Sequence, residues 1–305
     1  GWAGEGPDLP ARGLFRDPPR PVAWRVRRLP AYEAIRDDPT QLARATRVVE
    51  RAANPHLDQA CAQAHGDQWV LAMPPAFPLS ADALDAVHEL PYARAPHPTY
   101  DAPIPAFAMI AHSLQITRGC FGGCSFCAIA LHEGRDVQSR SAASVLRELQ
   151  AMQAAPGFRG TVSDLGGPTA NTFGLGCGDP QRNRRCRRPS CLHPRVCPFL
   201  KTDHTALRQL MAAVRQAPGV KHVHIASGVR HDLALMDPAY LEDLVRHHVG
   251  GHLHVAPEHD DPRVLQLARK PDYATFERFR QRFAQLCERC GVERYLNPYF
   301  LSGLP

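Results

Sequence analysis

Three cysteines in one short loop have the spacing of a metal-binding site. The segment Gly119-Cys120-Phe121-Gly122-Gly123-Cys124-Ser125-Phe126-Cys127 places its thiols at C-x3-C-x2-C, and its glycines let the backbone turn tightly. Thiolates are the soft ligands that iron–sulfur clusters require. Three ligands leave one iron of a [4Fe-4S] cluster open to a small molecule. The spacing therefore predicts that Cys120, Cys124 and Cys127 bind a [4Fe-4S] cluster.

Two other interpretations of this loop stay open. One is a zinc knuckle that takes His132 as its fourth ligand, and the other is a set of buried thiols without a metal. Zinc sites usually contain paired C-x2-C elements, whereas this triplet is isolated. The triplet therefore favours iron and sulfur over zinc.

A second cysteine group follows within an insertion at residues 168–202. Its four cysteines span 21 residues, with 8, 4 and 5 residues between them: Cys177, Cys186, Cys191 and Cys197. The segment has little apolar content, so burial alone would not order it. A metal could order it instead, either zinc held by four thiolates or an auxiliary [4Fe-4S] cluster. A redox-active or disordered loop is the alternative.

Arginines surround this second group. They could bind the phosphates of RNA or an acidic substrate, or simply form a solvated basic loop. The six positions are Arg182, Arg184, Arg185, Arg187, Arg188 and Arg195.

The elements that must position these residues form βα units. Short apolar runs alternate with helical patterns from residue 106 onward, which indicates a parallel sheet. The predicted helices are Ala142–Ala154, Asp203–Ala217, one from Asp237-Pro238 to Gly250-Gly251, and one ending at Cys290-Gly291. The predicted strands are Ser113–Thr117, Thr161–Leu165, His222–Ala226, His252–Ala256 and Tyr295–Leu301. This pattern predicts an α/β fold, a partial (β/α) barrel with its Cys-rich insertion after the second strand.

Several segments together resemble the YgiQ family of radical-SAM proteins, from about Leu29 to the end of the chain. An aromatic residue directly before the third cysteine is similar to the superfamily pattern. The other segments are His132-Glu133-Gly134-Arg135, Gln138-Ser139-Arg140-Ser141, Ser163-Asp164-Leu165-Gly166-Gly167-Pro168-Thr169-Ala170-Asn171, Ile225-Ala226-Ser227-Gly228 and Ala256-Pro257-Glu258-His259. The resemblance implies an enzyme that reductively cleaves S-adenosylmethionine to a 5′-deoxyadenosyl radical, which abstracts hydrogen from an unknown substrate. It also implies an electron donor, and a chain that is a fragment of a longer protein.

The resemblance and the strand ends together suggest how S-adenosylmethionine would be held. Phe126 would lie near the adenine, and Gly166-Gly167 would meet the methionyl amine through its backbone. Pro168 stands where the superfamily commonly has an acid, so Glu258 is a candidate for that contact. Ser227 and Arg230 have the chemistry to bond the ribose and the methionyl carboxylate, although a helix cap and a surface pair would use the same residues.

Two further functions remain open. The run Arg135 with Ser139-Arg140 resembles that of radical-SAM methylthiotransferases, many of which modify tRNA. A non-enzymatic iron–sulfur or zinc protein that binds RNA is the other. RNA is therefore a candidate partner beside an anionic small substrate.

The composition sets limits on the whole chain. It has 305 residues and a net charge of +6, a mild preference for anionic partners. No apolar stretch of about 18 residues could span a bilayer and the N-terminus is unlike a signal peptide, which predicts a cytoplasmic protein with reduced cysteines. The expected organisation is a linker or arm at 1–28, an α-rich supporting region at 29–105, and a radical-SAM core at 106–305 that is incomplete at its C-terminus.

Overall fold

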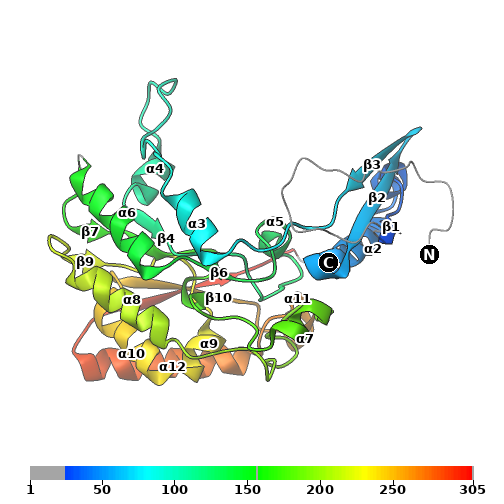
Figure 1. Cartoon of the computed structure of the whole chain (residues 1–305). Helices are drawn as coiled ribbons and strands as arrows, with labels where there is room; N and C mark the ends of the chain where they lie inside the picture. Colours follow the sequence, from blue (N-terminus) through cyan, green and yellow to red (C-terminus); the bar gives the residue numbers. More distant parts are fainter. Residues whose placement is uncertain (1–24, 156, 304–305) are drawn as a thin grey trace. The chain divides into compact units, whose positions relative to one another are not determined.

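The computed structural model of the chain describes residues 25–155 and 157–303, and these fall into two compact units (Figure 1). The first unit contains residues up to Phe77 together with Asp179–Pro189, and the second contains Pro78–Gly178 and the rest from Ser190. Most of the predicted N-terminal arm, residues 1–24, lies outside the described residues. The predicted domain boundary at residue 105 stays a prediction.

The first unit combines helices with a small sheet. Strand β2 pairs in parallel with β1 and antiparallel with β3, and Gly66 makes the turn between β2 and β3 with a φ of 59°. Asn54 fixes the later segment of this unit, because its side-chain amide donates to the carbonyls of Asn183 and Cys186. The elements are β1 Arg25–Arg28, α1 Tyr32–Asp37, α2 Pro39–Ala52, a 3-10 turn at Pro55–Leu57, β2 Gln59–His65, β3 Gln68–Ala72 and α7 Pro180–Arg185.

The second unit contains parallel strands that follow one another in chain order. Short parallel ladders join β4 to β8, β7 to β9, and β10 to β11. Neighbouring ladders are linked by Leu165 N donating to His224 O, and by a parallel bridge between Val229 and Val255. The strands are β4 Ser113–Gln115, β5 Thr117–Arg118, β6 Gln138–Ser139, β7 Thr161–Val162, β8 Asp164–Gly166, β9 His222–Val223, β10 His252–Glu258 and β11 Tyr295–Phe300. All five predicted strand segments are confirmed, and the described residues form no closed barrel.

Helices cover one side of these strands. Figure 1 shows α6, α8, α10 and α12 following one another along the sheet. The helical elements of this unit are α3 Ala81–His88, α4 Pro105–Ile110, α5 Ile129–His132, α6 Ala142–Ala154, a 3-10 turn at Ala170–Thr172, α8 Thr205–Gln216, α9 His231–Met236, α10 Pro238–Asp243, a π-helical turn at Leu244–His248, α11 Pro262–Ala268 and α12 Tyr273–Cys290.

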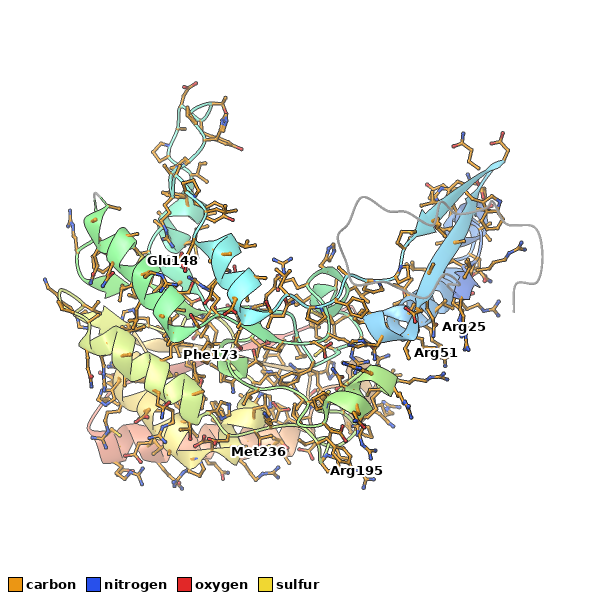
Figure 2. All side chains as sticks on the ribbon, viewed as in Figure 1. Arg25, Arg51, Glu148, Phe173, Arg195 and Met236 are labelled. Carbon is orange, nitrogen blue, oxygen red and sulfur yellow. The ribbon has the colours of Figure 1, made fainter. Side chains whose placement is uncertain are left out.

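The main hydrophobic core lies between these helices and the strands. Leu149 of α6, Leu210 of α8 and Phe279 of α12 pack with Val223 and Leu253, all of them nearly or completely buried. Phe173, labelled in Figure 2, belongs to the same core. Fully burying a side chain of this size contributes roughly 1.5–3 kcal/mol. The strands therefore turn apolar side chains to the helices.

Local capping explains where the predicted helices begin and end. The Asp237 carboxylate accepts from Tyr240 N while Pro238 occupies the first helical position, and Gly291 ends α12 with a φ of 63°. Helix α3 begins after Ser80, whose hydroxyl accepts from Ala83 N.

Several elements were missed. Helix α9 is absent from the prediction, and the three-stranded sheet makes the front region a mixture of helix and strand rather than α-rich as predicted. Strand β2 escaped notice because its apolar positions are mainly alanines, which carry little strand signal. Among the described residues, no helix has the length and apolar character needed to cross a membrane.

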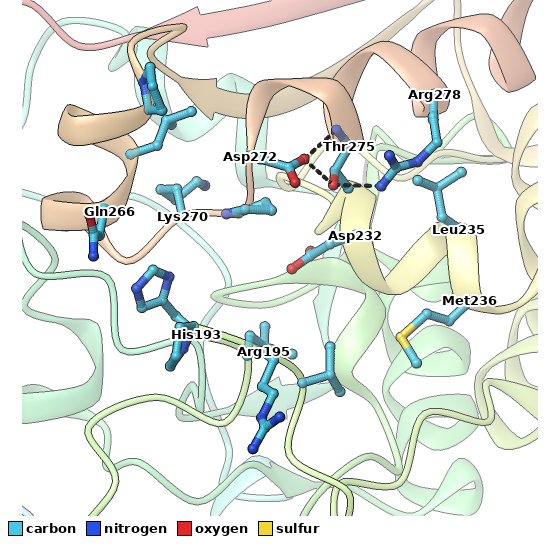
Figure 3. Close-up of a pocket in the computed structure, with 16 residues that line it drawn as sticks. His193, Arg195, Asp232, Leu235, Met236, Gln266, Lys270, Asp272, Thr275 and Arg278 are labelled. Atoms are coloured by element: carbon cyan, nitrogen blue, oxygen red, sulfur yellow. Dashed lines mark hydrogen bonds between the residues drawn. The ribbon is translucent and has the colours of Figure 1, made fainter.

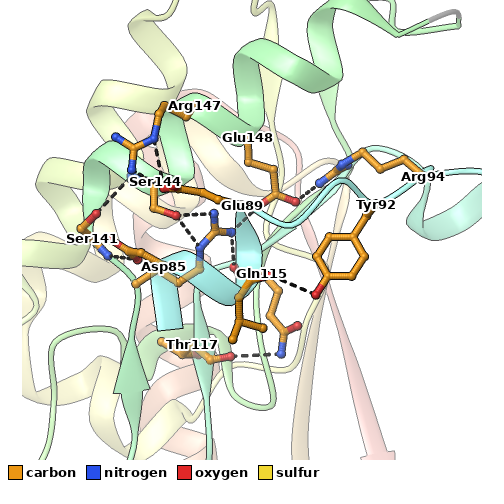
Figure 4. A network of polar contacts seen from close by, with 12 residues as sticks. Asp85, Glu89, Tyr92, Arg94, Gln115, Thr117, Ser141, Ser144, Arg147 and Glu148 are labelled. Atoms are coloured by element: carbon orange, nitrogen blue, oxygen red, sulfur yellow. Dashed lines mark hydrogen bonds and ion pairs between the residues drawn. The ribbon is translucent and has the colours of Figure 1, made fainter. Parts of the chain in front are cut away.

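A buried ion network holds helix α3 against α6 within the second unit (Figure 4). Arg140, which is 2% exposed, donates to Glu148, to the Ser144 hydroxyl and to the carbonyl of Gln115. Asp85 of α3 accepts from Ser141 N at 2.9 Å, at the start of α6. The network therefore connects α3, α6 and the first strand.

Candidate functional site

The loop with the three cysteines leaves the first parallel strand and is shaped by two glycines. Cys120 N donates to Gly134 O at 3.0 Å, and Gly119 N donates to a Glu133 carboxylate oxygen at 3.0 Å. Gly119 has a φ of 85°, and a Cβ there would stand 2.3 Å from Asp136 O. Gly123 also has a positive φ, of 61°. A side chain at Gly119 would therefore break the return of the chain that closes the loop.

The end of helix α11 supports the middle of this loop. Ser125 donates from its backbone N to Ala268 O at 3.2 Å and from its hydroxyl to Leu267 O at 2.7 Å. Arg269 donates to Gly123 O at 3.1 Å. Cys124 and its neighbours are thus held by a helix from the far end of the chain.

Arg230 lies against the loop from the strand side. Its Nη1 is 3.7 Å from the sulfur of Cys124, and a Cβ at Gly122 would be 3.3 Å from the same nitrogen. The other side of the guanidinium pairs with the Asp232 carboxylate at 2.9 and 2.5 Å. Asn171, completely buried, accepts from Arg230 N at 2.8 Å and donates to Arg230 O at 3.0 Å. Arg230 is therefore fixed at both its backbone and its side chain.

A second buried ion pair lies close to Arg230. Glu258 ends β10 with a φ of 75°, a conformation that is unusual for a residue other than glycine. Its carboxylate is 3.4 Å from the Lys270 ammonium, and both residues are less than 10% exposed. Burial and the nearby Arg230 lower the pKa of Lys270. The methionyl contact predicted for Glu258 stays a prediction, and in this structure the carboxylate faces a lysine.

The strand ends at Gly166 and Gly167 are close to neighbouring chain atoms. A Cβ at Gly166 would stand 2.3 Å from Ser227 Oγ, and one at Gly167 would stand 2.4 Å from Thr117 Oγ1. Both positions therefore require glycine on packing grounds, in addition to any contact with a ligand. The buried Thr117 hydroxyl has no hydrogen-bond partner among the described residues.

The Ser227 side chain already has a partner. Its hydroxyl donates to Asp164, whose other carboxylate oxygen accepts from Ala226 N at 2.8 Å and Ser227 N at 3.0 Å. Asp164 thus organises the turn after the third parallel strand. The predicted ribose contact of Ser227 stays a prediction, and it would use the hydroxyl oxygen as an acceptor.

The three cysteines have the surroundings that an iron–sulfur cluster needs. Burial raises the pKa of the Cys127 thiol, and the nearby Cys124 and Cys120 raise it further. Mutual repulsion of this kind is relieved when a cationic metal core binds the thiolates. Cationic side chains from two directions, Arg230 and Lys270, face the same loop. Three thiols faced by two cationic side chains fit a [4Fe-4S] cluster with three protein ligands.

Phe126, the residue before the third cysteine, is 42% exposed. An exposed ring is free to meet another flat ring, as the predicted adenine contact requires. In the described part of the chain, no three His, Cys, Asp or Glu side chains converge closely enough to hold a single metal ion. The identity of any bound metal therefore stays a prediction at both cysteine groups.

Part of the Cys-rich insertion packs directly on the cluster loop. Cys191 N donates to Phe121 O at 3.0 Å, and Cys197 N donates to Cys191 O at 2.7 Å. Cys177 forms an antiparallel bridge with Leu200. A small hydrophobic cluster joins this layer: Phe121, Leu175, Leu192, Leu200 and Leu233. Cys186 belongs to the first unit, so the predicted four-thiolate site stays a prediction.

A cavity of about 670 Å³ lies beside the two ion pairs (Figure 3). Asp232 and Lys270 form part of its wall, together with His193, Arg195 and Arg278. No residue of the cluster loop and none of the predicted S-adenosylmethionine contacts lines it. The cavity is therefore separate from the strand ends. Two of its charged residues, Asp232 and Lys270, also belong to the ion pairs beside the cysteine loop.

Four residues of this site had no role in the sequence-based prediction: Asp164, Asn171, Asp232 and Lys270. Asp164 and Asn171 occur inside a motif that resembles the family, which is a signal that was available. Asp232 follows Arg230 by two residues, but only the fold turns the carboxylate back onto the guanidinium. Lys270 reaches the site through tertiary structure alone.

Comparison with known proteins gives two family matches and several similar relatives. The family described as "Radical SAM superfamily" matches residues 114–295, and the one described as "Radical SAM N-terminal" matches residues 14–113. UPF0313 protein YgiQ of Salmonella typhimurium is 46% identical over 97% of the chain and 41% of its own length. UPF0313 protein blr7973 of Bradyrhizobium diazoefficiens is 48% identical over 92% of the chain and 42% of its own length. The chain thus spans about two fifths of the length of the curated relatives it matches.

Proposed function

We propose, because the chain belongs to the radical SAM superfamily and to its YgiQ family of UPF0313 proteins, that it is the core of a radical-SAM enzyme. Cys120, Cys124 and Cys127 would hold a [4Fe-4S] cluster with one open iron. The observation that carries this proposal is the position of the three thiols: one glycine-shaped loop after the first parallel strand, backed by a buried arginine 3.7 Å from Cys124.

The chemistry that a cluster and S-adenosylmethionine supply when bound is transfer of one electron into the sulfonium, which releases methionine and a 5′-deoxyadenosyl radical that takes hydrogen from the substrate. The electron must come from a low-potential one-electron donor. The protein's own contribution is to hold the reactants in place and keep water out.

Strand-end residues would orient S-adenosylmethionine. Gly166 O accepts from Ile116 N at 2.8 Å, so the methionyl amine would meet the backbone here as an additional contact at Gly166 and Gly167. Asp164 sets the turn that presents Ser227 toward the ribose, and Phe126 offers its exposed ring to the adenine. Arg230 has its donors on Asp232 and Cys124, so the carboxylate contact predicted for it would need a rearrangement of these bonds.

The test is anaerobic release of 5′-deoxyadenosine. The protein is reconstituted with iron and sulfide, reduced with dithionite and mixed with S-adenosylmethionine. We expect product from the wild type and none from Cys120→Ala, Cys124→Ala or Cys127→Ala. Cys290→Ala, at the end of α12 and outside both cysteine groups, is the matched control and should retain release. A cluster-loaded wild type that yields no 5′-deoxyadenosine would contradict the proposal.

Several finer predictions accompany this proposal. A second metal at Cys177, Cys186, Cys191 and Cys197 is tested by metal analysis of the triple variant that lacks the three loop cysteines. Retained zinc or iron would support the second site. Transfer of a methylthio group to tRNA, binding of RNA without catalysis, and a cytoplasmic location stay predictions.

A further inference from the structure

Arg230 is a buried cation whose charge is directed at the cysteine loop. Its Nη1 is 3.7 Å from Cys124 Sγ, and the residue is 8% exposed. The Asp232 carboxylate lies on the opposite edge of the guanidinium, 2.5 Å from Nη2. The ion pair is therefore oriented, with its positive end toward the loop and its negative end away from it.

Several contacts prevent the arginine from leaving this position. Asn171 binds both its backbone N and its backbone O, and the Asn171 carbonyl accepts in turn from His204, which is fully buried. Arginine does not lose its proton in proteins, and the Asp232 carboxylate pairs with this guanidinium at 2.9 and 2.5 Å. The guanidinium thus keeps its charge in a place where water cannot screen it.

Other charged groups of both signs also lie near the loop. Lys270 is paired with Glu258 on another side, and Arg269 donates to Gly123 O within the loop. With Glu133, which accepts from Gly119 N at 3.0 Å, three of these side chains are cationic, Arg230, Arg269 and Lys270, and three are anionic, Asp232, Glu258 and Glu133, while the Arg230 guanidinium lies 3.7 Å from a cysteine sulfur. Reduction of a cluster in the loop adds one negative charge, and a fixed nearby cation stabilises that charge.

We infer that Arg230, fixed by Asn171 and Asp232, is a positioning residue that raises the reduction potential of the cluster held by Cys120, Cys124 and Cys127. This inference rests on the proposed function, because it presupposes a cluster in the loop. It assigns the guanidinium to the thiolate side of the site rather than to the methionyl carboxylate. The arginine lets a donor of ordinary low potential reduce the cluster.

The test is a redox titration of the reconstituted cluster in the absence of S-adenosylmethionine. Electron paramagnetic resonance monitors the reduced cluster at each potential. An arginine that only bound the methionyl carboxylate would leave this midpoint unchanged. In Arg230→Gln we expect the reduced-to-oxidised ratio at a fixed applied potential to fall at least tenfold, about 59 mV for a one-electron couple. In Asp232→Asn the midpoint should rise, because a negative charge behind the arginine is lost.

Two further variants keep the result interpretable. Arg263→Gln removes the same charge from an 88% exposed side chain. In this variant the reduced-to-oxidised ratio at the fixed potential should stay within twofold of the wild-type value. If Arg230→Gln loses iron because Asp232 is left unpaired, the double variant Arg230→Gln/Asp232→Asn removes both charges and decides the question. An unchanged midpoint in an iron-loaded Arg230 variant would overturn the inference, and a wild type that binds no cluster would instead overturn the proposed function.

Discussion

The second unit contains two buried arginines that differ in what surrounds them. Arg140 divides its donors among Glu148, a hydroxyl and a backbone carbonyl, and none of these partners belongs to the cysteine loop. Arg230 pairs with a single carboxylate on one edge and faces a cysteine sulfur on the other. Burial lowers the pKa of Arg140 to about 10, whereas Asp232 raises that of Arg230. The same residue type thus joins helices in one place and places an oriented charge in another.

The largest effect on stability is expected at Arg140. Arg140→Ala leaves the Ser144 hydroxyl and Gln115 carbonyl without donors and leaves Arg94 as the remaining ion-pair partner of Glu148, which should cost about 3 kcal/mol of the free energy of unfolding. Urea denaturation measures this loss. The cluster midpoint, measured in the fraction that folds, should not change. A shift of the midpoint in this variant would end the distinction between the two arginines.

Much of the frame around these arginines could be predicted because its signals are local. Asp237-Pro238 and Ser80 are caps whose bonds close within three residues, and Gly291 ends its helix at the next position. The alternation of His252 and Leu253 gives the two faces of β10 directly. Such patterns reveal each element without knowledge of its partners.

The rest of the site depends on distances that a pattern does not contain. Asn171 and Arg230 are 59 positions apart in sequence, and the support of Ser125 comes from Leu267, 142 positions away. Strand β2 pairs with β1 across 34 positions through residues with weak strand preference. The cysteine loop was recognisable from its own spacing, but the charges that back it became visible only in the fold.

The next largest effect is a pH dependence of the free energy of unfolding, and it comes from His231, the residue after Arg230. Burial lowers the pKa of His231 to about 4, well below the 6.5 of an unfolded chain. The unfolded state therefore takes up the proton first, so stability is complete above pH 6.5 and falls as the pH drops toward 4. The loss is about 3 kcal/mol for this histidine.

His248 makes a similar contribution, because burial also lowers its pKa to about 4. His231→Phe removes one of the two titrating rings and should therefore remove roughly half of their combined pH dependence. The phenyl ring should be tolerated because it can keep the contacts with Phe276 and Phe279. Unfolding by urea at pH 6.5, 5.5 and 4.5 gives the slope. An unaltered slope in this variant would show that His231 is already protonated in the folded protein.

Asn171→Ala tests whether the clamp on Arg230 matters for position rather than for stability alone. Removing the amide leaves the Arg230 backbone N and O without partners and should cost about 1–3 kcal/mol. The reduction potential of the cluster should also fall, as in Arg230→Gln, but by a smaller amount than in that variant. Thr172→Ala, which removes a local hydroxyl bond to Thr169 O, is the matched control and should affect stability only. Equal midpoints for both variants would assign Asn171 a structural role like that of Arg140.

The smallest effect is expected for an exposed ion pair that spans the same two helices as the Arg140 network. Arg147 of α6 contacts Glu89, the residue that follows α3, and their side chains are 55% and 43% exposed. Water screens this pair and both side chains lose freedom in forming it, so Arg147→Gln should cost less than about 1 kcal/mol. Together with Arg140→Ala, this variant compares an exposed ion pair with a buried one, because Arg140 pairs with Glu148 of α6 and Arg147 of the same helix pairs with Glu89. A cost at Arg147 as large as that at Arg140 would mean that the helix contact itself, and not the burial of the charge, holds α3 in place.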